Sequence, residues 1–275
     1  MKGSMNKSVF LFCLCELLLV YSCLNAQTES KREYELVWQD DFKGNSIDTC
    51  SWSFLKRIPY NCGRYWSDNA KLYRVSGGKI RIFARRNNGL APNDTAQFLT
   101  GGLTTHKKRF IGYGKIEVRA RIKGGQGTWP AIWTLREDGK NDTRKKGYAE
   151  LDIMEYVNRN RFAYQTIHTY YTLQQGSKGH QIKANVNFEK WNIFAVEILP
   201  NRIIYSVNGH DTCVYTRNPF LEEEGQWPFG IDMYLMMDMQ VGGSWVGHVD
   251  PKTFPAYMDV DWVRMYKWKG TEESH

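Results

Sequence analysis

The stretch Lys115-Ile116-Glu117-Val118-Arg119-Ala120-Arg121-Ile122 alternates polar and apolar positions without a fault. Successive side chains of a β-strand point to opposite faces, so this pattern predicts a strand with one buried face in an antiparallel sheet. The shorter run Lys79-Ile80-Arg81-Ile82 repeats the pattern. We therefore expect a chain built from half-buried strands.

Further segments have the length and composition of strands, and clusters of Gly, Asn, Asp and Pro separate them. No segment keeps a helical period for three turns. So many strands with short connections predict an all-β fold, a jelly-roll sandwich of two stacked antiparallel sheets. The segments are 34–38, 97–103, 131–135, 149–157, 164–171, 191–198, 203–207, 212–215, 233–237 and 258–266.

The composition is that of a globular protein, with 42% hydrophobic and 24% charged residues among 275. Residues 34–268 contain no linker, repeat or low-complexity block, so we expect one domain there. Aromatic residues make up 14% of the chain, which suggests a binding cleft. The formal charge of +8 comes from scattered basic residues, whose longest run is Arg144-Lys145-Lys146. No nucleic-acid-binding motif appears, so we expect no nucleic-acid partner.

The N-terminus has the pattern of an export signal over residues 1–26. Lys2 and Lys7 precede an apolar stretch, 9–20, that only Glu16 interrupts. This stretch is shorter than the ~20 residues of a membrane-spanning helix. Cleavage after Ala26 would release a soluble protein, whereas cleavage before Cys23 would leave a cysteine for a lipid anchor. Either way we expect export from a bacterial cytoplasm, as a secreted, periplasmic or cell-surface protein.

Without that signal, the cysteines of the domain are Cys50, Cys62 and Cys213. Three cysteines allow one disulfide and one free thiol, and we expect a bridge between Cys50 and Cys62 because they flank one loop-like stretch. No cysteine or histidine spacing is typical of zinc. The sequence therefore predicts no metal ligands and no required cofactor.

The segment Glu150-Leu151-Asp152-Ile153-Met154-Glu155 places three acids on a predicted strand. Strict alternation would bury Glu155 between the sheets, where an unpaired carboxylate is costly. A β-bulge at Met154 or Glu155 would add one residue and turn all three acids to the same face. The alternative is a solvated strand face that is acidic by chance.

The neighbouring sequence favours the functional interpretation of these acids. The stretch 124–133, rich in Gly and Trp, precedes them, and Gln165-Thr166-Ile167-His168-Thr169 follows. If 157 and 162 flank a tight hairpin, His168 falls within a residue or two of Asp152 on the neighbouring strand. A supporting role for His168 beside the carboxylates follows from that placement.

The chain resembles glycoside hydrolase family 16, whose members include laminarinases, agarases, carrageenases and endo-β-galactosidases. The resemblance covers nearly the whole chain after the signal, and 34–268 would be its catalytic domain. Besides the acidic segment, the matching stretches are Leu36-Val37-Trp38-Gln39-Asp40-Asp41-Phe42, Phe110-Ile111-Gly112-Tyr113-Gly114-Lys115, Arg119-Ala120, Trp129-Pro130-Ala131-Ile132-Trp133, Val241-Gly242-Gly243-Ser244-Trp245 and 258–266.

The resemblance implies a concanavalin A-like jelly roll with the acids on a concave sheet that forms a substrate cleft. It also implies hydrolysis with retention of the anomeric configuration. Glu150 would be the nucleophile and Glu155 the general acid, then base, with their carboxyl groups ~5 to 5.5 Å apart. Asp152 would hold Glu150 by a hydrogen bond and couple its titration to the others.

Sugar rings have flat apolar faces and polar edges, which suit tryptophan beside hydrogen-bonding groups. Trp129, Trp133 and Trp245 match positions that line the cleft in the family. Further substrate-binding candidates are His168, Gln240, Tyr170 and Arg85. Some members bind a structural calcium ion on the convex side, and Asp261 lies in the matching C-terminal stretch.

Departures from the laminarinase pattern bear on the substrate. Their usual Asn-Leu-Ala-Val-Gly-Gly segment is replaced by Asp238-Met239-Gln240-Val241-Gly242-Gly243, and the stretch 63–69 also differs. The chain is more similar to members that cut poly-N-acetyllactosamine in mucin-type O-glycans as endo-β-1,4-galactosidases. We expect a monomeric enzyme of that kind, acting on a glycan. The alternatives are an endo-β-1,3(4)-glucanase (laminarinase), a non-catalytic lectin on the same fold, and a basic exported protein that binds acidic polymers.

Overall fold

The computed structural model describes residues 33–60, 62–174 and 180–270. The chain divides into two units, of which one holds residues 34–268 together with 272–275 and the other holds 1–33 with 269–271. The expected export signal, 1–26, and the lipid-anchor position Cys23 lie outside the described residues. Among the residues that are described, no helix has both the length and the apolar character needed to cross a membrane.

Strands are the main secondary structure of the larger unit. In chain order its elements are β1 (Tyr34–Asp40), β2 (Ser53–Phe54), η1 (Ala70–Leu72), β3 (Tyr73–Val75), β4 (Ile80–Arg86), β5 (Phe98–Thr100), β6 (Gly102–Thr104), β7 (Phe110–Ile111), β8 (Gly114–Lys123), β9 (Thr128–Arg136), β10 (Ala149–Glu155), β11 (Phe162–Thr169), α2 (Tyr170–Gln174), β12 (His180–Asn185), β13 (Asn192–Ile198), β14 (Arg202–Val207), β15 (His210–Thr216), η2 (Pro219–Glu224), β16 (Met233–Val241), η3 (Pro251–Thr253) and β17 (Ala256–Trp268).

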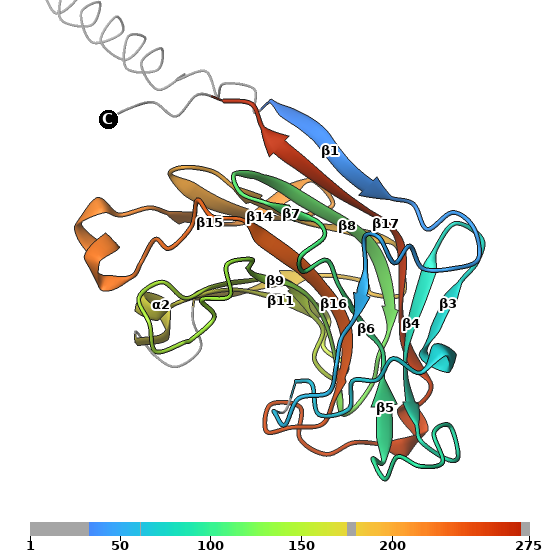
Figure 1. Cartoon of the computed structure of the whole chain (residues 1–275). Coiled ribbons are helices and arrows are strands. Elements are labelled where there is room, and N and C mark those ends of the chain that lie inside the picture. The colour runs from blue at the N-terminus through green and yellow to red at the C-terminus, as the bar shows by residue number, and fades with distance from the viewer. Residues whose placement is uncertain (1–32, 61, 175–179, 271–275) are drawn as a thin grey trace, which may run out of the picture. The chain divides into compact units, whose positions relative to one another are not determined.

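The strands form two stacked sheets whose paired strands all run antiparallel (Figure 1). The nine-stranded sheet has the order β15-β14-β13-β8-β17-β4-β3, with β1 also paired to β17 and β5 to β4. The eight-stranded sheet has the order β12-β11-β10-β9-β16-β6-β2, with β7 also paired to β16. The predicted all-β jelly-roll sandwich is confirmed.

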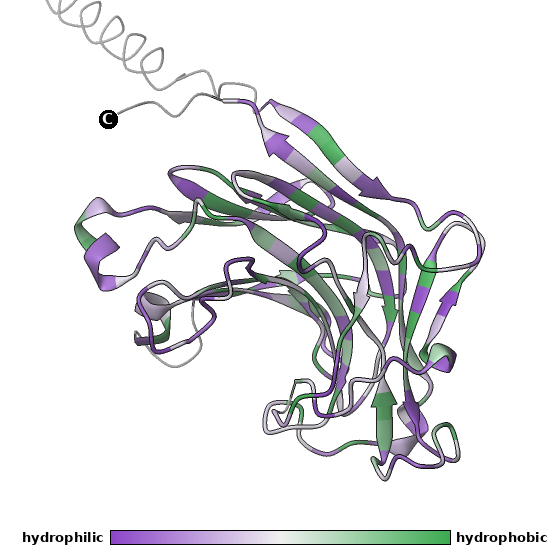
Figure 2. Ribbon diagram, viewed as in Figure 1, coloured by the Kyte–Doolittle hydropathy of each residue, from purple (hydrophilic) through white to green (hydrophobic). Residues whose placement is uncertain are grey.

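The alternating stretch of the sequence lies in β8, near the centre of the nine-stranded sheet. Ile116, Val118 and Ala120 are fully buried and belong to one hydrophobic core with Leu151 and Ile153 of the other sheet. Figure 2 shows the alternation of hydrophilic and hydrophobic residues along these strands. The core therefore lies between the sheets, and each sheet turns a second face away from it.

Four strands escaped prediction, namely β2, β3, β7 and β12. The first three have only two or three residues, too few to show a period, and β12 is an edge strand of six residues of which only Ala184 is buried. The predicted strand at 164–171 ends at Thr169. There the Thr172 hydroxyl accepts a 2.8 Å hydrogen bond from the backbone N–H of Thr169, and α2 begins at the next residue.

The predicted disulfide between Cys50 and Cys62 is wrong, because both are free thiols, as is Cys213. Cys50 is exposed in a turn, where its backbone N–H donates to Asp48. Cys62 packs instead against a small hydrophobic cluster that includes Trp66. The two cysteines thus have separate surroundings although one loop-like stretch joins them.

Candidate active site

A β-bulge in β10 turns the three acids to one face of the eight-stranded sheet. Asp152 pairs with Trp133 of β9, and Met154 pairs with the neighbouring Ile132. Ile153, which lies between Asp152 and Met154, therefore has no partner in β9. The register with β11 shifts over the same interval. Because Ile153 and Met154 both point into the core, Glu155 points the opposite way, as Glu150 and Asp152 do. A bulge in this segment is confirmed, but its unpaired residue is Ile153 and not Met154 or Glu155.

We call this surface, on the side of the sheet away from the core, the acidic face. Side-chain alternation brings to it the residues of β9, β10, β11 and β16 that do not enter the core. It comprises Trp129 and Trp133 of β9, Glu150, Asp152 and Glu155 of β10, Tyr164 and His168 of β11, and Asp238 and Gln240 of β16.

His168 lies directly beside two of the acids, as the hairpin register predicts. It is paired with Glu150 across β10 and β11. Its Nε2 is 3.1 Å from Oδ2 of Asp152 and 3.8 Å from Oε1 of Glu150. Burial lowers the pKa of His168, but the hydrogen bond to Asp152 and the charges of both acids outweigh it and raise the pKa to about 9. The imidazole therefore carries a positive charge at neutral pH, between two carboxylates.

The two glutamates have environments that favour their protonated forms. Burial and then the charge of Asp152 raise the pKa of Glu150 to about 7, against the opposing effects of His168 and of a 2.6 Å hydrogen bond from the Tyr148 hydroxyl. Burial and the charge of Asp152 also raise the pKa of Glu155 well above its usual value. Among the residues that the structure describes, no cation lies beside Glu155 as His168 lies beside Glu150, so Glu155 is the better placed of the two to keep its proton.

Two tryptophans and a tyrosine surround Glu155. The indole Nε1 of Trp129 donates a 2.8 Å hydrogen bond to Oε1 of Glu155. Trp245, from the loop after β16, meets the Trp129 ring edge-on at 4.7 Å and the Tyr164 ring at 5.1 Å. These half-buried rings give a sugar an apolar surface next to an acid.

Asp238 was missed by sequence reasoning, although strand alternation from Gln240 would have placed it on the same face. It is fully buried, and its two oxygens accept hydrogen bonds from the indoles of Trp66 at 2.9 Å and Trp133 at 2.8 Å. Burial raises the pKa of Asp238 to about 7, against those two hydrogen bonds and one from Gln240. Trp66 was also missed, and Asp238 fixes it beside the predicted sugar-binding Trp133.

The other substrate-binding candidates, Gln240, Tyr170 and Arg85, lie in different parts of the fold. Gln240 lies on the acidic face, where its buried Oε1 accepts no hydrogen bond from the described residues and so can serve a sugar hydroxyl. Tyr170 begins α2, two residues beyond His168, and its role stays a prediction. The assignment of Arg85 is wrong. It lies on β4 of the other sheet and covers the Phe83 ring at 4.1 Å, on the face opposite the buried Ala84.

Asp261, the expected calcium ligand, has a protein partner on the convex side. Its Oδ2 accepts a hydrogen bond from Nη1 of Arg119, and calcium binding there stays a prediction. Among the residues that the structure describes, one set of three ligand atoms lies within 4.8 Å, from Glu150, Asp152 and His168. That set offers too few oxygens for calcium, which takes six to eight. Its hydrogen bonds instead fit a group of acids held in place by a histidine.

Comparisons with known proteins identify relatives of two specificities. The model of "Glycosyl hydrolases family 16" matches residues 65–264. A keratan-sulfate endo-1,4-beta-galactosidase of Sphingobacterium multivorum is 31% identical over 89% of this chain, which spans 58% of that protein's length. A beta-glucanase of Rhodothermus marinus is 32% identical over 98% of this chain and 96% of its own length.

A solved structure from work on endo-acting O-glycanases, with which prominent members of the human gut microbiota initiate mucin breakdown, has a TM-score of 0.76 to this chain. It is 25% identical and covers 86% of this chain and 100% of its own. The sheets, the bulged acidic strand and the extent of the family match agree with one another. The chain belongs to glycoside hydrolase family 16 and is an endo-acting glycosidase.

Proposed function

We propose that the protein is a retaining endo-β-galactosidase that cleaves internal β-galactosidic bonds of poly-N-acetyllactosamine in mucin-type O-glycans. The observation that carries the proposal is the bulge in β10, which presents Glu150, Asp152 and Glu155 on one face. A lectin on this fold has no need of three crowded carboxylates, whose mutual repulsion is costly. Action outside the cytoplasm, expected from residues 1–26, suits a polymeric host glycan.

In the proposed reaction Glu155 donates its proton to the glycosidic oxygen while a Glu150 oxygen attacks the anomeric carbon from the opposite side. The bond to the leaving sugar breaks, and a covalent glycosyl-enzyme forms with inverted configuration. The Glu155 carboxylate then takes a proton from a water molecule, whose oxygen attacks the same carbon and releases Glu150. Two inversions give net retention.

Asp152 and His168 would position the nucleophile in this reaction. The His168 cation stabilises the ionised form of Glu150, which the attack requires, and the Tyr148 hydroxyl acts in the same direction. Asp152 holds the imidazole at 3.1 Å and its charge favours the protonated form of Glu155. The charge of Asp152 favours protonation of both glutamates, but His168 and Tyr148 oppose it only at Glu150.

The choice of substrate is supported by the residues at the end of β16. Laminarinases usually have Asn and Ala where this chain has Asp238 and Gln240, and both of these lie on the acidic face. The similarity to the keratan-sulfate enzyme and to the O-glycanase structure points the same way. An endo-β-1,3(4)-glucanase is the second candidate, because the Rhodothermus marinus beta-glucanase matches over 98% of the chain.

Parallel incubation with poly-N-acetyllactosamine, gastric mucin, laminarin and mixed-linkage glucan would test the proposal. Mass spectrometry should detect oligosaccharides ending in galactose from the first two, and proton NMR should show the β-anomer as the first product. The Glu150→Gln variant should release no product while it still binds the glycan. Release of glucose oligomers from laminarin alone would select the second candidate, and an α-anomer as first product would contradict retention.

A further inference from the structure

A separate basic pocket lies between the end of β8, the turn that follows β10 and the segment before β13. Its volume is about 690 Å³, within the range of small-molecule sites. Arg121 and Lys123 come from β8, Arg159 and Arg161 from the turn after β10. No residue assigned above to the reaction or to sugar binding on the acidic face lines this pocket.

The charge of the pocket is strongly positive. Four cations line it against one acid, Glu189. Arg121 bonds to Asp259, but Arg81 shares that carboxylate, at 2.6 Å and 2.8 Å, so two cations are set against one anion.

The other cations of the pocket are even less neutralised. Arg159 is 3.9 Å from Asp250, at the limit of an ion pair. For Lys123 and Arg161, no carboxylate of the described residues lies within 4.0 Å. Such a group of uncompensated cations favours an anionic ligand.

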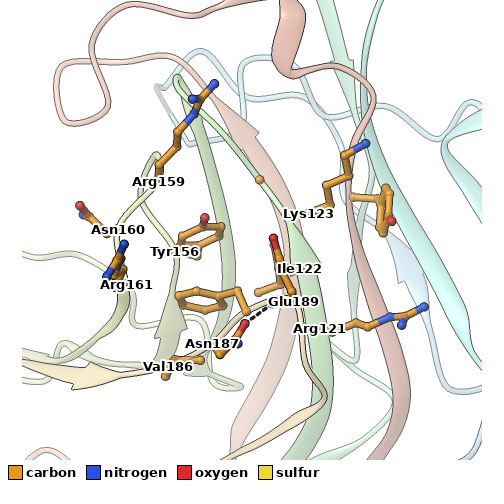
Figure 3. A pocket seen from close by; sticks show the side chains of 13 residues that line it. Arg121, Ile122, Lys123, Tyr156, Arg159, Asn160, Arg161, Val186, Asn187 and Glu189 are labelled. Carbon is orange, nitrogen blue, oxygen red and sulfur yellow. Dashed lines mark hydrogen bonds between the residues drawn. The ribbon is translucent and has the colours of Figure 1, made fainter.

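The pocket also contains aromatic rings between its cations. Tyr156 stacks on Phe188 with ring centroids 3.9 Å apart. Figure 3 shows Tyr156 between Arg159 and Arg161 on one side and Lys123 on the other. A flat ring flanked by cations suits a sugar with a negatively charged substituent, since the sugar's apolar face covers the ring and its anion meets the cations.

We propose that this pocket binds an anionic sugar residue, one that carries a sulfate ester or a carboxylate, as a second, non-catalytic glycan site. The ligand class rests on the proposed function, because host glycans of the mucin and lactosamine type would supply such a residue. The pocket is joined to the catalytic strand. Tyr156 directly follows Glu155, and its backbone N–H donates to Pro130 of β9 at 3.0 Å.

Calorimetric titration of the Glu150→Gln protein would test this second site without hydrolysis. The probes are sulfated lactosamine oligosaccharides, the same oligosaccharides after desulfation, and sialylated lactosamine, whose anion is a carboxylate. Adding Lys123→Ala and Arg161→Ala should weaken binding of an anionic probe at least about tenfold and leave the desulfated probe unaffected. The anionic probe whose affinity falls in this variant identifies the substituent as sulfate or carboxylate.

The matched control replaces one lysine and one arginine outside the pocket, Lys71→Ala with Arg86→Ala, and should keep the affinity for the anionic probes. In the otherwise wild-type enzyme, Lys123→Ala with Arg161→Ala should leave hydrolysis of a short neutral substrate unchanged. Equal loss in the control pair would show a general charge effect and overturn the proposal. Unchanged affinity of the pocket variant for the anionic probes would also overturn it. The same holds if single-stranded DNA binds in the pocket as tightly as the sulfated sugar does.

The outcomes also separate this inference from the proposed function. If the wild-type enzyme cuts only laminarin but the pocket still binds anionic sugars, the substrate proposal fails and the pocket proposal stands. If the enzyme cuts lactosamine chains but the binding of no anionic probe depends on Lys123 and Arg161, only the pocket proposal fails.

Discussion

The indole of Trp129 donates its N–H to the carboxyl of Glu155 at 2.8 Å, and the same ring meets Trp245 edge-on at 4.7 Å. One side chain therefore takes part both in the aromatic surface proposed to hold the sugar and in the hydrogen bonding of the proposed acid. Because that hydrogen bond favours the charged form of Glu155, it opposes the effect of burial. The position of Trp129 thus affects both the proposed sugar-binding surface and the pKa of Glu155.

Trp129→Phe should raise the pKa of Glu155 further, since it removes a hydrogen bond that lowers this pKa. The alkaline limb of the kcat/KM profile reports loss of the proton from the general acid, so it should move upward by about one pH unit. Trp133→Phe is the control, because its indole bonds to Asp238 instead. An alkaline limb that stays in place in Trp129→Phe would refute the role of this hydrogen bond.

The charge on His168 should make the stability of the protein depend on pH. Its pKa is 6.5 in the unfolded chain and about 9 in the fold, so folding takes up a proton between these values. The free energy of unfolding should therefore fall by up to about 3 kcal/mol as pH rises through that window. Below pH 6.5 both states are protonated and this stabilisation is fully present.

Urea unfolding across that pH window would measure the effect. His168→Gln cannot titrate, so this variant should lose most of the decline, whereas the exposed His248→Gln should keep the wild-type dependence because it leaves the Asp152–His168 pair intact. If His168→Gln and wild type decline in parallel, the Asp152–His168 bond does not stabilise the fold as the geometry indicates.

Local pattern was enough to predict part of this site. The conflict between alternation and a buried Glu155 predicted the bulge, and the hairpin register predicted His168 beside Asp152. Alternation from Gln240 places Asp238 on the same face, but its hydrogen bonds could not be predicted, because its partners Trp66 and Trp133 are 172 and 105 residues away in sequence. Its role depends on which strands become neighbours, and sequence period does not contain that information.

The error at Arg85 has the same origin. The alternation in β4 correctly gives a half-buried strand, but a strand of that pattern fits either sheet of a sandwich. Only the pairing of β4 with β17 places it in the nine-stranded sheet. Alternation in the sequence thus predicts the strands and their buried faces. The sheet to which each strand belongs depends on pairing between distant segments.

Asp238→Asn should weaken substrate binding more than it slows the reaction. The carboxylate accepts from two indoles, but an amide has one oxygen acceptor, so either Trp66 or Trp133 must lose its partner. We expect KM to rise about tenfold and kcat to change less than about threefold. Initial-rate kinetics would measure both.

The exposed Asp232→Asn is a matched control on the same segment of chain and should leave both constants unchanged. Intrinsic fluorescence should report the altered indole environment in Asp238→Asn alone. A variant with wild-type KM and fluorescence would show that the two indoles are held without Asp238.

Deletion of Met154 tests the bulge directly. With one residue fewer, Ile153 can pair with Ile132 in a regular strand, and alternation keeps Glu155 on the acidic face without a bulge. The deletion should therefore cost about 2 to 5 kcal/mol through the lost core side chain and still allow hydrolysis. Met154→Leu keeps the extra residue and should cost less than about 1.5 kcal/mol with activity retained. Thermal unfolding and glycan hydrolysis, measured on both variants, would separate loss of the bulge from loss of a core side chain. A deletion variant that folds but is inactive would mean that hydrolysis needs the geometry of the bulge itself and not only the face on which Glu155 lies.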